Sequence, residues 1–159
     1  MKFRPPVHLE KAHEPFLESF DCGDPVLNDW LKTKAIPNEE KKASRTYVVF
    51  TESGDPAGFF SICANALHHQ LMNAASRRNK PDPIPVVLIG RLAVDRKYQG
   101  CGLGTAMLDV AVAISRRISD IAGAVFVAVQ PISESAAKFY SRNGFKAAKS
   151  GGSLLIFRL

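Results

Sequence analysis

The sequence holds only three cysteines, and none of them has the spacing of a metal ligand. Cys22, Cys63 and Cys101 are scattered and odd in number, which favours reduced thiols in a cytoplasmic protein, with no metal site and no disulfide scaffold. The chain also lacks an apolar run near ~18 residues and a basic-then-apolar leader with a small-residue cleavage site. Neither a transmembrane span nor a secretory signal is therefore predicted, and no membrane partner is expected.

The composition is that of an ordinary folded protein with an uneven charge. The 159 residues are 46% hydrophobic and 23% charged, which predicts one domain over residues 1–159. Residues 1–76 carry 8 Lys and Arg against 10 Asp and Glu, whereas residues 77–117 carry 8 against 3. The basic excess suits a phosphorylated ligand, nucleic acid or both, and a solvated basic surface is the alternative.

Hydrophobic spacing predicts one mixed α/β domain. A helix is expected over residues 24–42, with Asp24 as its N-cap and Pro37 as the point where it breaks. Residues 70–85 are polar and proline-rich and are expected to form a loop. Gly90 lies inside an apolar strand and suggests a bulge there. The remaining predicted elements are strands at 45–51, 57–67, 86–94, 123–129 and 154–158, a helix at 103–118, and a helix at 133–143 with Ser133 as its N-cap.

A glycine-rich turn, Gln99–Thr105, joins the strand at 86–94 to the helix at 103–118. Glycines at alternate positions let the backbone approach a ligand, and the helix that starts there adds its positive dipole end. The turn therefore predicts a pyrophosphate site. A Walker loop is excluded because no Lys follows Gly104, and a dinucleotide fingerprint is excluded because Thr105 stands where its third glycine belongs.

The pattern that remains, Gln99-x-x-Gly102-x-Gly104, resembles the pyrophosphate motif of the GNAT N-acetyltransferase superfamily. Two further segments in the right order are similar to that family: Gly90–Asp95 (GRLAVD), and Ala136-x-x-Phe139-Tyr140-x-x-x-Gly144-Phe145. The resemblance implies an α/β GNAT acyltransferase fold, with a central splayed mixed sheet flanked by helices. It also implies acetyl-CoA as the cofactor.

The resemblance also implies roles for individual residues. The backbone N–H of Leu92 would polarise the thioester carbonyl, and Tyr140 would give a proton to the leaving thiolate. A tyrosine packed in the core is the alternative for Tyr140. His68 and His69 could act as general bases or lie on the surface. The implied cofactor-binding residues are Leu92, Ala93, Val94, Arg96, Lys97, Gln99, Gly100, Cys101, Gly102, Leu103, Gly104, Thr105 and Ser133, where many members of the family carry Asn in place of Ser133.

Four other segments, at residues 20–31, 45–49, 57–61 and 77–86, resemble a narrower group, the GNAT toxins of bacterial toxin–antitoxin modules. That resemblance implies acetylation of the α-amine of aminoacyl-tRNA, which blocks translation. It also implies that the toxin is a homodimer and that its partner is a ribbon-helix-helix antitoxin. DNA would be bound only through this antitoxin. A small amine or a protein N-terminus as acceptor, and a non-catalytic CoA-binding interaction module, are the alternatives. The candidate tRNA contacts are Arg77, Arg78, Lys80, Arg91, Arg116 and Arg117.

Overall fold

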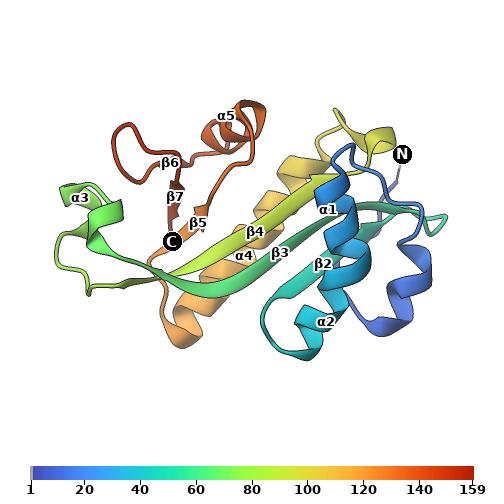
Figure 1. The fold of residues 1–159 in the computed structure, drawn as a ribbon, viewed down its shortest axis with the longest axis horizontal. Helices are drawn as coiled ribbons and strands as arrows, with labels where there is room; N and C mark the ends of the chain where they lie inside the picture. Colours follow the sequence, from blue (N-terminus) through green and yellow to red (C-terminus); the bar gives the residue numbers. More distant parts are fainter. Residues whose placement is uncertain (1) are drawn as a thin grey trace. The chain divides into compact units, whose positions relative to one another are not determined.

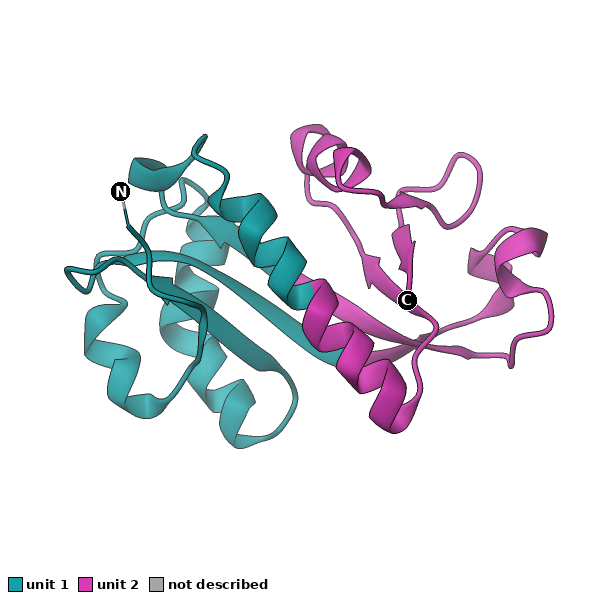
Figure 2. Cartoon of the chain, turned by 180° about the vertical axis from the view of Figure 1, so that it is seen from behind, with its two compact units in different colours: residues 1–63, 91–111 teal, residues 64–90, 112–159 magenta. Residues whose placement is uncertain are grey.

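The computed structural model describes residues 2–159, which form two compact units that alternate along the chain. Unit 1 comprises residues 1–63 and 91–111, and unit 2 comprises residues 64–90 and 112–159 (Figure 2). Three elements contribute residues to both units: β3 (Pro56–Leu67), β4 (Ile84–Val94) and α4 (Leu103–Ala122). That the whole chain is a single domain stays a prediction.

The strands form a mixed sheet, as predicted, in the order β1-β2-β3-β4-β5-β7-β6 (Figure 1). β4 runs parallel to β5, whereas β2 is antiparallel to β3 and β7 is antiparallel to both β5 and β6. No helix among the described residues is long and apolar enough to cross a membrane. The elements not yet given are β1 (Val7–His8), β2 (Arg45–Phe50), β5 (Phe126–Val129), β6 (Lys146–Ala147), β7 (Leu155–Arg158), α1 (Pro25–Asp29), α2 (Ala35–Glu40), α3 (Ala74–Arg77) and α5 (Glu134–Arg142).

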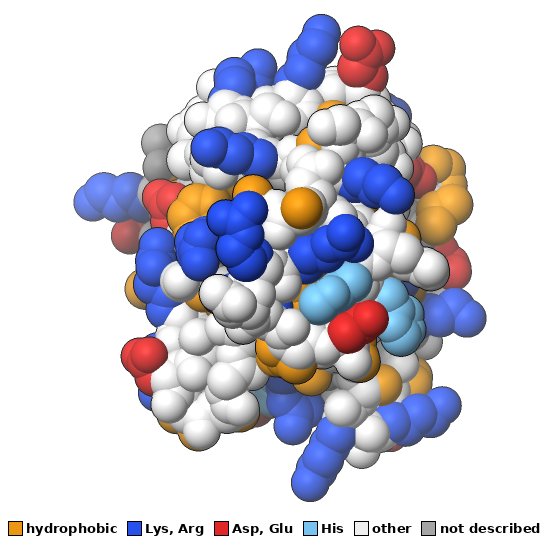
Figure 3. Space-filling model, turned by 90° about the vertical axis from the view of Figure 1, so that its left-hand side faces the viewer, with side chains coloured by type: hydrophobic (Ala, Val, Ile, Leu, Met, Phe, Trp, Pro, Cys, Tyr) orange, Lys and Arg blue, Asp and Glu red, His pale blue; other side chains and the backbone are white. Residues whose placement is uncertain are grey.

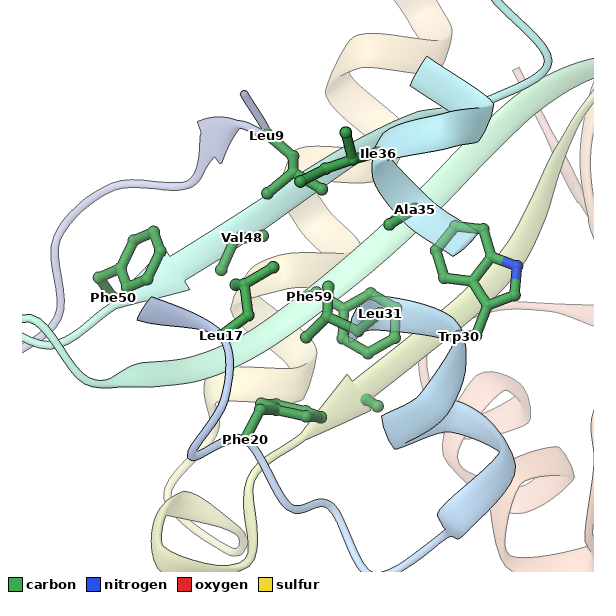
Figure 4. Close-up of a cluster of buried hydrophobic side chains, with 11 residues drawn as sticks. Leu9, Leu17, Phe20, Trp30, Leu31, Ala35, Ile36, Val48, Phe50 and Phe59 are labelled. Atoms are coloured by element: carbon green, nitrogen blue, oxygen red, sulfur yellow. The ribbon is translucent and has the colours of Figure 1, made fainter. Parts of the chain in front are cut away.

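The core of unit 1 lies between the β2–β3 hairpin and the N-terminal helical segment. Val48 on β2 pairs with Phe59 on β3, and both side chains are fully buried. Apolar side chains from α1 to α2 complete this cluster, which Figure 4 shows. Its buried members are Leu9, Leu17, Phe20, Trp30, Leu31, Ala35, Ile36, Val48, Phe50, Phe59 and Ala93.

The predicted helix over 24–42 is interrupted at a different place from the one expected. Asp24 is the N-cap, as predicted, and its carboxylate accepts from Val26 N. The irregularity is a π-helical turn at Trp30–Lys34, and α2 begins only after it. Pro37 therefore lies in the first turn of α2, where an N–H needs no acceptor within the helix. The helix is thus divided into two α-helical pieces, as predicted, but the irregular turn lies before Pro37 and not at it.

Unit 2 packs around the parallel ladder of β4 and β5, whose partners run from Val86↔Phe126 to Ile89↔Val129. α4 extends to Ala122, four residues beyond the predicted end, and Gly123 with φ +91° stops it by donating to Ser119 O. The loop predicted over 70–85 contains α3, because Asn73 N–H donates to Ala148 O and holds the start of that short helix. The buried core residues are Leu67, Met72, Ile84, Val86, Phe126, Ala128, Ala148 and Ile156.

Candidate functional site

The glycine-rich turn has the backbone geometry that its sequence predicts. Gly100 and Gly102 adopt φ of +79° and +88°, a region that side chains disfavour. Gly102 O accepts from Ala106 N at 3.1 Å, so α4 begins at the turn and the N–H groups of Leu103–Thr105 fall in its first turn. Such N–H groups have no acceptor within the helix, and the helix dipole adds positive potential there. A Cβ built on Gly102 would meet no atom within 4 Å, so the space beside the turn is open for a pyrophosphate.

Asp95 holds the chain that leads into this turn. Its side chain is 2% exposed, Oδ2 accepts from Asp21 N and Oδ1 accepts from Lys97 N, each at 2.9 Å. The backbone N–H of Arg96 donates to the backbone carbonyl of Asp21 at 2.8 Å. Two segments more than seventy residues apart in sequence are therefore joined directly before the glycines.

Gln99 makes a second connection to the same N-terminal segment. Its Nε2 donates to Cys22 O at 3.1 Å and to Val94 O at 2.9 Å. The resemblance assigned Gln99 to the cofactor, but both bonds of its amide nitrogen lie within the protein. The side chain therefore helps to hold the turn in place, and a contact between Gln99 and the cofactor stays a prediction.

Hydrogen bonds also stabilise the N-terminal segment around Asp21. Asp21 Oδ1 accepts from Gly23 N and Asn28 Nδ2, and the Asn28 and Gly23 bonds lower the pKa of Asp21 below its usual value. The Arg96 guanidinium lies against Gly23, where an added Cβ would come within 3.0 Å of Nε. None of the residues Asp21–Asn28 was predicted to belong to the site, although they lie in the segment 20–31 that resembles the narrower group of toxins.

Cys101 and Lys97, in and before the turn, both contact Tyr98. Cys101 is exposed and its thiol donates to Tyr98 O at 2.9 Å, so its side chain turns back onto the protein. Lys97 Nζ lies 5.8 Å from the Tyr98 ring centre, a distance at which attraction to the ring is weak but present. Their roles toward the cofactor stay predictions.

The strand end that precedes the turn, Leu92–Val94, belongs to unit 1. The β4–β5 ladder ends at Ile89, one residue before Gly90, so Leu92–Val94 lie beyond it. Ala93 is 7% exposed and packs in the core of unit 1, and the carbonyl of Val94 is engaged by Gln99. The bulge expected at Gly90 stays a prediction, since β4 is continuous from Ile84 to Val94.

Tyr140 lies on α5 in unit 2, with its ring packed edge-on against Phe139 and Phe145. Burial raises the pKa of Tyr140 well above that of a free phenol. Across residues 2–159 no hydrogen bond engages its hydroxyl. The hydroxyl is therefore protonated at neutral pH, and its role as the proton donor to the thiolate stays a prediction. Ser133 caps α5 by accepting from Ala136 N at 3.1 Å, which matches its predicted capping role.

The family model for the acetyltransferase (GNAT) domain matches residues 42–147. The chain belongs to the GNAT acetyltransferase family. A relative from Mycobacterium tuberculosis named tRNA-acetylating toxin is 36% identical over 128 residues, which are 80% of this chain and 76% of the relative. This GNAT chain is an acetyl-CoA-dependent N-acetyltransferase, as the sequence predicted.

Solved structures agree over nearly the whole chain. AtaT complexed with acetyl-methionyl-tRNAfMet has a TM-score of 0.87 at 25% identity and covers 99% of this chain and 95% of that one. A tyrosine-to-phenylalanine variant of AtaT, bound to the C-terminus of the antitoxin AtaR and to acetyl-CoA, has a TM-score of 0.80 at 25% identity. That match covers 99% of this GNAT chain and 94% of the AtaT chain. The predicted GNAT fold is confirmed.

The candidate RNA-binding cations of this GNAT enzyme have different surroundings. Arg78, Arg116 and Arg117 are exposed, and the Arg116 guanidinium lies 5.7 Å from the Phe157 ring centre. Arg77 donates to His69 O at 3.1 Å, and Lys80 is partly buried. Lys and Arg side chains are frequent on the face that Figure 3 shows, among His side chains and few acidic ones.

Arg91 differs from the other candidate cations. Its guanidinium lies 4.0 Å from the centre of the Trp30 ring and is only partly exposed. Its guanidinium packs over an aromatic ring and is partly exposed, and its assignment to an RNA phosphate stays a prediction.

The two neighbouring histidines are held in the loop of unit 2. His69 Nε2 lies 2.7 Å from Pro81 O, and His68 Nδ1 lies 3.5 Å from Asp82 Oδ1. The His69 backbone N–H and the nearby histidines lower the pKa of Asp82. These contacts give both rings a local structural role, and a catalytic one stays a prediction.

Proposed function

We propose that this acetyltransferase is a toxin whose acceptor is the α-amine of an aminoacyl-tRNA. The observation that carries the proposal is the 36% identity, over 80% of the chain, to a protein named tRNA-acetylating toxin. The match to AtaT in complex with acetyl-methionyl-tRNAfMet supports the same class of product. An acetylated α-amine has no free lone pair to attack the next ester, so acetylation of this group stops peptide-bond formation.

The acceptor amine suits a site without a strong base. A free α-amine has a pKa near 8 and is partly neutral at cellular pH. The ester carbonyl of an aminoacyl-tRNA lowers that value further, because it withdraws electron density from the amine more strongly than a peptide amide does. The described residues therefore need to position the amine more than to deprotonate it.

Acetyl-CoA supplies the acetyl group as a thioester, and its pyrophosphate fits the turn at Gly100–Thr105. The backbone N–H of Leu92 would donate to the thioester carbonyl oxygen and polarise it. As the C–N bond forms and the C–S bond breaks, the hydroxyl of Tyr140 would supply a proton to the departing sulfur. The amine gives its proton to water, and Tyr140 recovers a proton from the solvent.

Cations of unit 2 contact the RNA in this proposal. Arg77, Arg78 and Lys80 would contact phosphates from the loop around α3, and Arg116 and Arg117 would do so from α4. Phosphate contacts give affinity without sequence preference, so the amino acid and the tRNA body are selected by other groups.

The proposal extends to the partners. An antitoxin binds the toxin and neutralises it, as the AtaT–AtaR complex supports. A ribbon-helix-helix fold for that antitoxin, DNA contact only through it, a homodimeric toxin and action in the cytoplasm are the finer parts of the proposal.

The deciding experiment is incubation with charged total tRNA and labelled acetyl-CoA, followed by identification of the acetylated aminoacyl species. Label on one or a few aminoacyl species, absent with the Tyr140→Phe variant, is the expected result. Polyamines and peptides with free N-termini are assayed beside the tRNA. Label on those acceptors alone would contradict the proposal and favour a small-amine or N-terminal acetyltransferase.

A further inference from the structure

Three flat groups of unit 1 are stacked from the core to the surface. The rings of Phe59 and Trp30 lie 6.0 Å apart at an interplanar angle of 9°, and Figure 4 shows both. Phe59 is fully buried and Trp30 is 7% exposed. The Arg91 guanidinium forms the outer layer, 4.0 Å from the Trp30 ring centre. The stack therefore ends in the Arg91 cation, whose guanidinium carbon lies over the indole.

Arg91 has no anionic partner among the described residues. It makes no ion pair with a carboxylate, and among titratable groups only the Cys63 thiol acts to raise its pKa. Partial burial without an anion lowers the pKa of Arg91, because the charged form loses water. The indole face offsets part of that loss. Arg91 is partly exposed on the side away from the indole, and a cation in this position suits a flat, electron-rich ring.

The sequence position of Arg91 brings this plane close to the reacting groups. Arg91 directly precedes Leu92, whose N–H is proposed to hold the thioester carbonyl. In an aminoacyl-tRNA only the terminal ribose separates the esterified amino acid from the terminal adenine. The adenine is therefore the ring of the RNA that lies nearest to the reacting amine, and arginine planes commonly stack on unpaired bases.

We propose that Arg91, backed by Trp30, stacks on the 3′-terminal adenine of the acceptor and so places the aminoacyl ester at Leu92. This inference rests on the proposed function and assigns Arg91 to a base in place of a phosphate. Lysine cannot replace it, because an ammonium group has no plane to stack.

The test compares acceptors with and without the base. Wild-type enzyme and Arg91→Lys are assayed with charged tRNA, with the same amino acid esterified to adenosine, and with that amino acid esterified to ribose lacking a base. Removal of the base from the wild-type acceptor should lower kcat/KM about 10- to 100-fold, the usual worth of one stacked base. In Arg91→Lys, charged tRNA and the adenosine ester should lose about the same factor, and the ribose ester should be unchanged. Arg158→Lys, an exposed arginine at the end of β7, is the matched control and should match wild type on all three acceptors.

Other outcomes overturn the inference in distinguishable ways. Equal losses on all three acceptors would mean that Arg91 supports the strand or the cofactor. A loss on charged tRNA alone would return Arg91 to a phosphate contact. A wild-type enzyme that ignores the base would refute the stack without any variant, so poor folding of Arg91→Lys would leave the test intact. Wild-type enzyme that acetylates none of the three acceptors would contradict the proposed function itself.

Discussion

The buried carboxylate of Asp95 offers a test of how the cofactor turn is held. Asp95→Asn keeps one carboxamide oxygen but replaces the other with an NH2 group. Asparagine is also a good N-cap, so its oxygen can keep the bond to Lys97 N. The NH2 group then faces the N–H of Asp21, where the carboxylate accepted a bond at 2.9 Å. The substitution therefore breaks the connection to the N-terminal segment and leaves the turn's own cap in place.

The size of the effect follows from the burial of Asp95. A hydrogen bond to a charged group contributes about 1.5–3 kcal/mol, and exposure of 2% gives no reason to discount it. For a chain of this length each kcal/mol lowers Tm by about 2–4 °C, so Asp95→Asn should lower Tm by roughly 3–12 °C. The free energy of acetyl-CoA binding can fall by no more than the contribution of this hydrogen bond, which limits the loss of affinity to about 10- to 100-fold.

Calorimetric unfolding and titration with acetyl-CoA measure the two quantities. Asp109→Asn, which changes an exposed carboxylate on α4, is the matched control and should shift Tm by less than about 2 °C. A variant at Asp95 with the Tm and the cofactor affinity of wild type would refute the reasoning, because it would show that the bond to Asp21 stabilises neither the fold nor the turn.

Four further predictions concern the cofactor turn, the proton donor and the RNA contacts. Gly102→Glu should abolish acetyl-CoA binding in titration calorimetry, whereas Gly54→Glu, at a hairpin glycine with φ +95° and equally open space, should bind normally; equal affinity in both would contradict the turn's assignment. Tyr140→Phe should keep the wild-type affinity for acetyl-CoA and lose roughly 10²–10⁴ in turnover, and a wild-type rate would mean that water supplies the proton. Because burial raises the pKa of Tyr140, the pH–rate profile should rise as the amine deprotonates and show no falling limb below about pH 10, so an earlier decline would exclude Tyr140 as the acid. Arg77→Ala with Arg78→Ala should raise KM for charged tRNA and lower the salt slope by about 0.7–0.9 for each lost phosphate contact, with acetylation of a small aminoacyl ester unchanged; equal losses on both acceptors would assign the arginines to the fold.

Local chemistry made part of this structure predictable. Asp24 and Ser133 are N-caps because their short side chains reach the first N–H groups of a helix, and both were placed from sequence. The glycine turn was also predictable, since positive φ at Gly100 and Gly102 requires residues without a Cβ. These features depend on a few consecutive residues.

The support of the turn was not predictable in the same way. The partners of Asp95 and Gln99 are Asp21 and Cys22, which lie 74 and 77 residues away in sequence. No sequence spacing relates residues that lie so far apart. Because the bonds end on backbone atoms, which every residue has, the partner positions require no particular residue type. The two-residue strand β1 is too short to show an alternation, so it too escaped prediction.

The bonds from Asp95 and Gln99 to the Asp21–Cys22 segment have a thermodynamic consequence. They make the order of the cofactor turn and the order of this segment one shared equilibrium. A molecule that binds the segment more tightly when those bonds are intact must raise the affinity for acetyl-CoA, and acetyl-CoA must raise the affinity for that molecule by the same factor. A molecule that binds only when the bonds are open must lower the affinity for acetyl-CoA, and acetyl-CoA must lower the affinity for that molecule by the same factor. The occupancy of the N-terminal segment by a partner therefore depends on the concentration of acetyl-CoA.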